Sequence, residues 1–124
     1  MKVLLSIRPE FALRIFDGSK RYEYRRAIFK THDVKTVVVY ASHPIRRVIG
    51  EFDIAEILCD IPEVLWEKTS QSAGITRKKF LAYFENKEMG YAIAVKTARA
   101  YDSPLFLRDL MVTYPPQSFL YLCS

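Results

Sequence analysis

The order of apolar and polar positions along the chain predicts short strands mixed with a few helices. The apolar run of residues 3–7 predicts a strand over residues 2–7, which Arg8 and Pro9 end. Pro9 suits the first turn of a helix, where its missing N–H costs nothing. A helical stripe follows and Gly18 provides the stop; the stripe consists of Phe11, Ala12, Ile15 and Phe16.

Three further segments have the pattern of strands. Residues 20–26 alternate, with Tyr22 and Tyr24 on the side opposite to Glu23 and Arg25. Residues 35–42 form a β-branched run that predicts a buried strand. Residues 46–58 predict a long strand, in which Gly50 marks a bend or a close backbone approach.

A helical insert is expected next, in two pieces. Asp60, Pro62 and Glu63 form a helix start, with Asp60 as the cap and Glu63 reaching back. A second helix is expected to start at Thr76, and Gly90 ends the turn that follows it. The apolar stripe of this second helix consists of Phe80, Leu81, Tyr83 and Phe84.

The chain closes with strands. Residues 91–101 predict another strand, and the Pro115-Pro116 pair separates a loop from a last strand at residues 118–122. This order predicts an α+β fold with a small mixed β-barrel of five to six strands flanked by helices, in a single domain over residues 1–124. No βαβ alternation or glycine-rich phosphate loop indicates a dinucleotide-binding sheet.

Composition narrows the classes of partner. The net charge of +5 and a pI near 9.3 favour an anionic partner such as RNA, DNA or a phosphorylated small molecule, although they also fit a merely soluble surface. No apolar stretch is long enough to span a membrane, and a cytoplasmic protein is expected. Cys59 and Cys123 are isolated in the sequence, which predicts two reduced thiols; a disulfide between them is the alternative. His32 and His43 have no clustered carboxylates, so no metal and no cofactor is predicted.

The segment of residues 17–26, DGSKRYEYRR, carries the densest candidate chemistry. If it lines a cleft, Lys20 loses solvation, titrates lower and becomes a usable base or nucleophile. Glu23 then orients Lys20 or accepts from a base, and Arg25 holds a phosphate or a carbonyl. The alternative is a solvated strand, because charge runs are usually surface faces.

Two other places are candidates. The segment Ser6-Ile7-Arg8-Pro9 lies where a strand meets a helix N-terminus, which favours an anion or, alternatively, simply caps the helix. Tyr40 and Ser42 lie at the end of an apolar strand, where an exposed tip could stack on a base; half-buried core is the alternative for the tyrosine.

Taken together, these segments resemble the ASCH domain of the PUA-like superfamily. The pattern G-x-K-x-x-E-x-R of that family appears as Gly18, Lys20, Glu23 and Arg25. The resemblance extends over nearly the whole chain in the right order; it rests on residues 4–26, 37–42, 48–54, 90–95 and 115–122. It implies a small β-barrel flanked by helices, with a cleft lined by the motif strand.

The resemblance implies RNA or nucleotide recognition, in RNA metabolism or in the regulation of transcription or translation. One branch of the family hydrolyses N4-acetylcytidine with a lysine, a threonine and a distal glutamate. The lysine matches Lys20, but the threonine position holds Glu23, and the glutamate position falls near Ser72 or Ala73, where no carboxylate stands. Another branch of the family is a ribonuclease. A protein–protein adaptor, with the barrel serving only as a scaffold, is a third interpretation of this chain.

The leading prediction is an RNA- or nucleotide-binding module, with a modified-nucleoside amidohydrolase as the alternative. If the chain is an enzyme, Lys20 and Glu23 are the expected catalytic residues. The predicted binding residues are Ser6, Arg8, Pro9, Lys20, Glu23, Arg25, Arg26, Tyr40 and Ser42.

Overall fold

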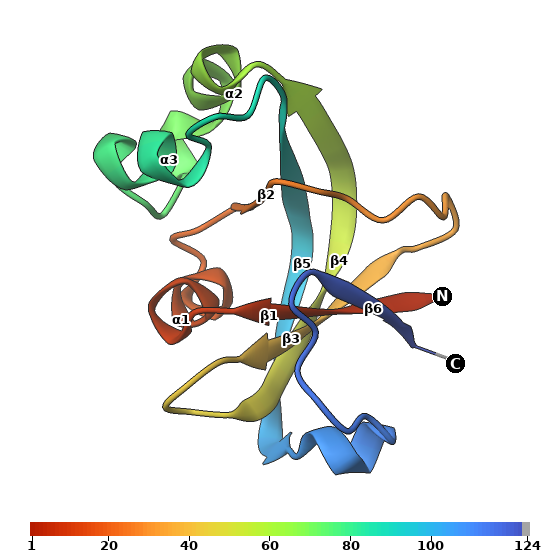
Figure 1. Cartoon of the computed structure of the whole chain (residues 1–124). Helices are drawn as coiled ribbons and strands as arrows, with labels where there is room; N and C mark the ends of the chain where they lie inside the picture. The colour runs from red at the N-terminus through yellow and green to blue at the C-terminus, as the bar shows by residue number, and fades with distance from the viewer. Residues whose placement is uncertain (123–124) are drawn as a thin grey trace.

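The computed structural model describes residues 1–122 and consists of one six-stranded sheet with short helices around it (Figure 1). The predicted segments all appear, with small shifts at their ends. The elements in chain order are β1 (Lys2–Ile7), α1 (Pro9–Asp17), β2 (Tyr22–Arg25), β3 (Thr36–Ala41), β4 (Arg47–Asp60), α2 (Pro62–Thr69), η1 (Ser70–Ser72), α3 (Arg77–Tyr83), β5 (Gly90–Leu105), η2 (Leu107–Leu110) and β6 (Phe119–Leu122).

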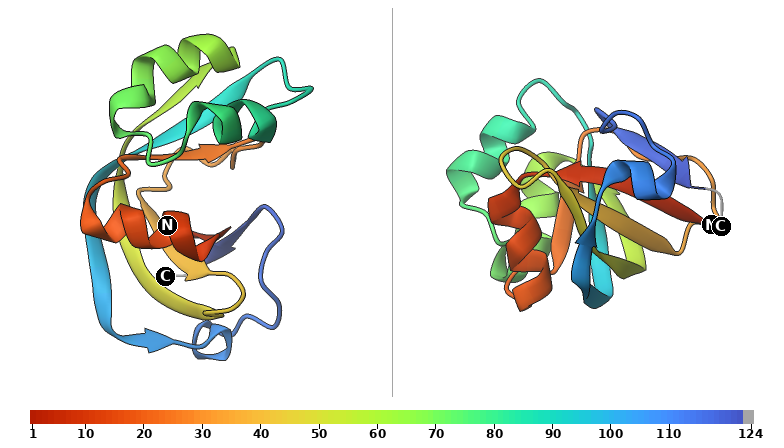
Figure 2. Two further views of the ribbon diagram at one scale, coloured as in Figure 1. Left: turned by 90° about the vertical axis from the view of Figure 1, so that its left-hand side faces the viewer. Right: turned by 90° about the horizontal axis from the view of Figure 1, so that it is seen from below.

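The sheet is mixed and strongly curved. Its strand order is β2-β5-β4-β3-β1-β6, with β1 parallel to β3 and every other neighbouring pair antiparallel. The long strands β4 and β5 bend around one side of the molecule (Figure 2). The predicted α+β class with a PUA-like arrangement of six strands is confirmed, but over residues 1–122 the sheet stays open, because β2 and β6 are its edges.

A single side chain spans this opening. Arg25 of β2 donates from Nη1 to the carbonyl of Ser6 at 3.3 Å and from Nη2 to the carbonyl of Ser118 at 2.7 Å. Ser6 belongs to β1, and Ser118 directly precedes β6. The opening is therefore bridged by hydrogen bonds from one guanidinium group.

Both faces of the central strands are covered, which explains their nearly continuous apolar runs. On one face, alternate residues of β1 and β3 join Ala12 and Ile15 of α1 in a buried cluster. On the other face, Leu4 and Val38 lie against residues that follow β5, including Leu107.

The two helices of the insert build a separate cluster against β2. Phe80 of α3 is fully buried, and its ring lies edge-on to that of Tyr24 with centroids 4.8 Å apart. The expected cap at Thr76 is confirmed, because its hydroxyl accepts from the backbone N–H of Lys79. The cap expected at Asp60 is wrong.

The start of α2 differs because β4 runs further than the apolar pattern indicates. Asp60 is the last residue of β4, and Ile61 takes the N-cap position without a side-chain cap. The carboxylate of Asp60 instead accepts from the N–H of Ile61 at 2.9 Å.

The close approach predicted at Gly50 is confirmed. A Cβ at this position would lie 2.5 Å from the carbonyl oxygen of Arg99 and 2.6 Å from the ring of Phe16. Only a residue without a side chain lets α1 lie this close to the sheet.

Candidate functional site

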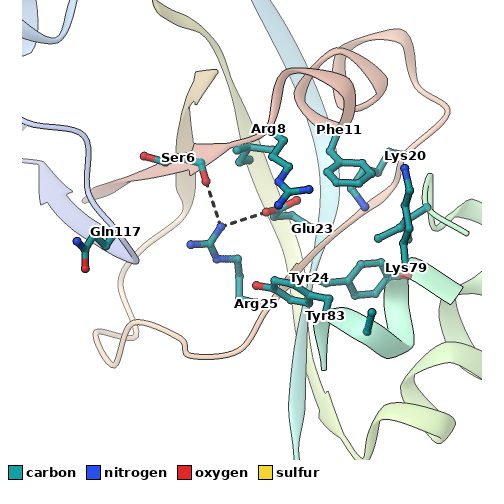
Figure 3. Close-up of a pocket in the computed structure, with 13 residues that line it drawn as sticks. Ser6, Arg8, Phe11, Lys20, Glu23, Tyr24, Arg25, Lys79, Tyr83 and Gln117 are labelled. Carbon is teal, nitrogen blue, oxygen red and sulfur yellow. Dashed lines mark hydrogen bonds and ion pairs between the residues drawn. The ribbon is translucent and has the colours of Figure 1, made fainter. Parts of the chain in front are cut away.

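A cavity of about 530 Å³ opens between the end of β1, the edge strand β2 and helix α3 (Figure 3). The cavity lies next to the opening between the edge strands β2 and β6, which Arg25 bridges. Its size is in the range of small-ligand pockets. The lining residues are Ser6, Ile7, Arg8, Phe11, Lys20, Glu23, Tyr24, Arg25, Ile75, Lys79, Ala82, Tyr83 and Gln117.

Glu23 and Arg25 form the polar centre of this pocket. They lie two residues apart on β2, so their side chains share a face, and Arg25 Nη1 contacts Glu23 Oε2 at 3.2 Å. Both side chains are nearly buried, with 12% of Arg25 and 8% of Glu23 exposed. The alternation of the segment predicts that these two side chains share one face, and in the structure they are in contact.

Lys20 is the most deeply buried charged residue described, with 2% of its surface exposed. Its Nζ donates to the carbonyl of Ala73 at 2.7 Å and lies 4.6 Å from the ring centroid of Tyr24 and 5.3 Å from that of Phe11. Burial lowers the pKa of Lys20 to about 8, while the negative charge of Glu23 partly opposes the shift. With this pKa, roughly a tenth of the amine is uncharged at pH 7 and about half at pH 8, which is the lowered titration expected for Lys20 in a cleft.

The partner of Lys20 comes from the loop between α2 and α3. Three successive carbonyl oxygens of this loop accept hydrogen bonds: Ser72 from the N–H of Arg21, Ala73 from Lys20, and Gly74 from the side chain of Arg14. Where the amidohydrolase resemblance places a glutamate, near Ser72 or Ala73, the structure provides a backbone carbonyl.

Gly74 makes this contact possible. Its φ is +63°, and a Cβ there would lie 2.5 Å from Cβ of Lys20. A side chain at this position is therefore excluded by both the backbone conformation and the space.

Tyr24 departs from the predicted arrangement. The alternation placed the tyrosines of β2 away from Lys20, yet Tyr24 lines the same pocket and underlies the amine. Lys20 lies two residues before the start of β2 at Tyr22, so the alternation within that strand does not set the direction of its side chain. The hydroxyl of Tyr24 is held by Thr69 at 2.6 Å, and burial raises the pKa of this phenol to about 12.

The other predicted residues divide into two groups. Ser6 and Arg8 line the pocket; Ser6 donates its hydroxyl to the carbonyl of Pro116 at 2.8 Å. The structure does not place Pro9, Arg26, Tyr40 or Ser42 among the lining residues.

Each of these four has another role or position. Pro9 starts α1. The guanidinium of Arg26 donates to the carbonyls of Tyr83 and Glu85 beyond α3. Tyr40 is buried in the cluster that residues after β5 cover, and the N–H of Ser42 donates to the carbonyl of Ile7.

Several lining residues were missed by the sequence analysis. Lys79 stands in the basic run of residues 77–79, which was a usable signal. Phe11 and Tyr83 were read only as apolar stripe residues, and no local pattern marks Gln117.

Two classes of site receive no support from the described chain. Among residues 1–122 no three histidine, cysteine, aspartate or glutamate side chains come together to hold a metal ion. No helix in that range is long and apolar enough to cross a membrane. Cys59 is an exposed thiol, and Cys123 lies outside the described residues.

The model of the ASCH domain family matches residues 5–99 of this chain. The chain belongs to the ASCH domain family. The matched range includes the whole Gly18–Arg25 motif and the loop that contacts Lys20. The resemblance seen in the sequence is thereby confirmed.

Solved structures and curated relatives agree with this assignment. A crystal structure of an ASCH protein from Zymomonas mobilis superimposes with a TM-score of 0.90 at 28% identity, covering 98% of this chain and 87% of that one. A curated relative from the same species, called an ASCH domain-containing ribonuclease, is 27% identical over 98% of this chain and 84% of its own length.

Longer proteins also contain a similar segment. A protein of Ureaplasma parvum named large ribosomal subunit protein uL22 is 29% identical over 97% of this chain, but the match spans only 39% of that protein. A protein named ATP synthase subunit alpha from the same organism matches at 29% identity, over 15% of its length. This chain therefore spans well under half the length of these relatives.

Proposed function

We propose that this ASCH domain binds RNA through the pocket between β1, β2 and α3. One observation carries the proposal: the pocket places several cationic side chains around an aromatic floor and contains a single carboxylate. The cations are Arg8, Lys20, Arg25 and Lys79, the carboxylate is Glu23, and the floor includes Phe11, Tyr24 and Tyr83.

The parts of the pocket suit the parts of a nucleotide. Arg8 is exposed, and Lys79 is engaged only in a surface ion pair with Glu10 at 3.6 Å, so both are free to contact a phosphate. The aromatic side chains offer faces on which a base stacks. Glu23 accepts from a base amino group, at an edge that Arg25 holds in place.

The ribonuclease name of the relative from Zymomonas mobilis supports RNA as the ligand, since the match extends over most of both chains. Phosphate contacts release counterions, so the proposal implies binding that weakens as salt rises.

The test is a titration of labelled single-stranded RNA, monitored by fluorescence anisotropy at a series of salt concentrations. Ribose 2′-O-methylation prevents cleavage during the measurement. We expect Arg8→Ala and Lys79→Ala each to weaken binding and to reduce the slope of log affinity against log salt by about 0.7 per lost phosphate contact.

Lys35→Ala is the matched control, because Lys35 is exposed and precedes β3 at the end away from Tyr40. An affinity that Arg8→Ala and Lys79→Ala do not change, or that is independent of salt, would contradict the proposal.

A second candidate function, RNA cleavage, is favoured by Lys20 alone. An uncharged Lys20 amine accepts the proton of a ribose 2′-hydroxyl, whose oxygen attacks the adjacent phosphorus. The bond from phosphorus to the 5′-oxygen breaks, and that oxygen takes up a proton from water, which yields a 2′,3′-cyclic phosphate and a free 5′-hydroxyl. The proton accepted by Lys20 returns to solvent. Arg8 and Arg25 would stabilise the charge that develops on the phosphate.

Cleavage is tested with unmodified RNA and with the same sequence carrying one 2′-deoxyribose. We expect a rate that rises up to about pH 8, the pKa of Lys20, and that is lost in Lys20→Met and at the 2′-deoxy position. Lys20→Arg, which keeps a charge but is never a base, separates binding from base catalysis. RNA cleavage that persists in Lys20→Met would rule out Lys20 as the base. Incubation of N4-acetylcytidine with the same variants tests the amidohydrolase interpretation.

A further inference from the structure

A second hollow lies beside the short helix η2, on the sheet face that η2 and the chain after it cover. Its volume is about 680 Å³, and it is more open than the first pocket. Its lining mixes basic, aromatic and apolar side chains: Tyr40, Arg46, Phe106, Leu107, Arg108, Met111, Val112 and Thr113.

The aromatic centre of this hollow is Phe106, held between two arginines. The guanidinium carbon of Arg47 lies 3.9 Å from the ring centroid of Phe106, and that of Arg108 lies 4.1 Å from it. Within residues 1–122, Arg46, Arg47 and Arg108 make no ion pair with a carboxylate. The nearby carboxylate of Asp109 is engaged, because it accepts from the N–H of Phe106 at 2.8 Å.

Two large side chains in or next to the hollow are exposed. Met111, which lines it, is 95% exposed, and Tyr114, which follows the lining residue Thr113, is 79% exposed. Phe106 itself remains 36% exposed although both arginines contact it. Positive charge without carboxylate partners, next to accessible apolar and aromatic groups, favours a ligand that is both anionic and able to stack.

The two hollows are neighbours across one pair of strands. Ser6 of β1, which lines the first pocket, is the register partner of Tyr40 of β3, which lines the second. The chain from η2 back to β6 also links them, since Thr113 lines the second hollow and Gln117 the first (Figure 2). The hydrogen bond from Ser6 to Pro116 fixes this linking segment to the sheet between them.

We propose that the surface made by Arg46, Arg47, Phe106 and Arg108 is a second contact site for the same single-stranded RNA that occupies the first pocket. This inference rests on the proposed function. The continuity with the first pocket favours a nucleic-acid strand over a separate ligand. The arginines contact phosphates, Phe106 holds Arg47 and Arg108 in position, and the exposed ring of Tyr114 stacks on a base.

The experiment compares two 2′-O-methylated RNAs, one of about four nucleotides and one of about twelve, on the wild type and three variants. The short RNA fills only the first pocket, so we expect wild-type affinity in every variant. For the long RNA we expect Arg47→Ala/Arg108→Ala to lower affinity by at least about tenfold and the salt slope by about 1.4, two single-strand phosphate contacts. Phe106→Ala should lower this affinity by about fivefold or more, because Arg47 and Arg108 lose the ring that holds them in position.

The control is Lys35→Ala/Lys87→Ala, which removes the same charge from exposed positions in loops away from η2. It should leave the long RNA within about twofold of wild type, and thermal melting should show all variants folded. Equal affinity of the wild type for short and long RNA would overturn the second site and leave the first pocket standing. Failure of the wild type to bind either RNA would instead overturn the proposed function. A long-RNA signal that polyglutamate competes away equally well would overturn RNA as the occupant.

Discussion

Two clusters of charged side chains in this molecule are built on opposite principles. On the outer side of β4 and β5, Arg99 contacts both oxygens of Asp53 at 2.8 and 3.0 Å and reaches Glu51 at 2.7 Å. Lys2 and Tyr101 complete this exposed cluster by contacting Glu51. In the pocket, by contrast, Lys20 is buried and its hydrogen-bond partner is an uncharged carbonyl.

The pKa values record the difference. The hydrogen bonds from Arg99 and Thr36 lower the pKa of Asp53 to about 2, so this carboxylate is more easily ionised in the folded protein. Burial moves the pKa of Lys20 toward the uncharged form. The exposed cluster stabilises the charges it contains, whereas burial of the Lys20 charge in the pocket lowers the stability of the folded protein. Buried charges with shifted pKa values are common at functional sites, so this cost in stability is consistent with the proposed function of the pocket.

The largest effect is expected at Gly74, whose replacement disturbs only the pocket. In Gly74→Ala the added Cβ meets Lys20 and the residue keeps an unfavourable positive φ. We expect the free energy of unfolding to fall by about 2–4 kcal/mol. Urea denaturation measures it. Gly18→Ala is the control with the same kind of φ but nothing within 4 Å of the new Cβ, so it should lose distinctly less.

A smaller effect of opposite sign is expected at Lys20. The lowered pKa means that the folded state disfavours the charged amine, and this penalty is present at any pH below about 8. Lys20→Met removes this penalty, so the variant should be more stable than the wild type at pH 7 by at most about 3 kcal/mol. The lost hydrogen bond to the carbonyl of Ala73 offsets part of the gain.

The pH dependence distinguishes this penalty from a simple packing gain. Between pH 8 and 10.5 the unfolded wild type holds more protons on Lys20 than the folded protein, so wild-type stability rises relative to the variant. Denaturation midpoints at pH 7, 9 and 10.5 should show the difference shrinking. A constant difference would show that charge burial is not its cause.

The smallest effect is expected in the exposed cluster. Because the folded pKa of Asp53 is about 2 and its usual value is 3.8, its contribution to stability is present above pH 4 and lost as the pH falls toward 2. Asp53→Asn should therefore be less stable than the wild type near neutral pH, with a difference that narrows on acidification. An acid titration monitored by circular dichroism measures this difference in stability. The difference should be smaller in high salt.

The charged groups of the pocket were unequally visible in the sequence. Glu23 and Arg25 lie two residues apart on one strand, so alternation alone put them on one face, and the ion pair follows. The partners of Lys20 could not be read in this way. Ala73 and Gly74 are more than fifty positions away and act through backbone atoms that no residue type reveals.

The same limit applies to the fold. Apolar runs located the strands, and Gly18 and Thr76 located helix ends, because these are local signals. The end of β4 at Asp60 was misplaced because pairing with Gly90 of β5 extends the strand, and that partner is distant in sequence. Tyr40 was assigned to the binding site because it lies at the end of an apolar strand, where an exposed tip was expected, but residues that follow β5 cover it.

The bridge formed by Arg25 has a consequence for the timing of assembly during synthesis. Lys20, Glu23 and Arg25 are synthesised about ninety residues before Pro116, Gln117 and Ser118, which tie or line the same pocket. A nascent chain that has reached only residue 110 contains the whole sequence motif and an unfinished pocket. The proposed RNA binding is therefore expected to begin only after the segment before β6 has been made and has docked onto Ser6 and Arg25.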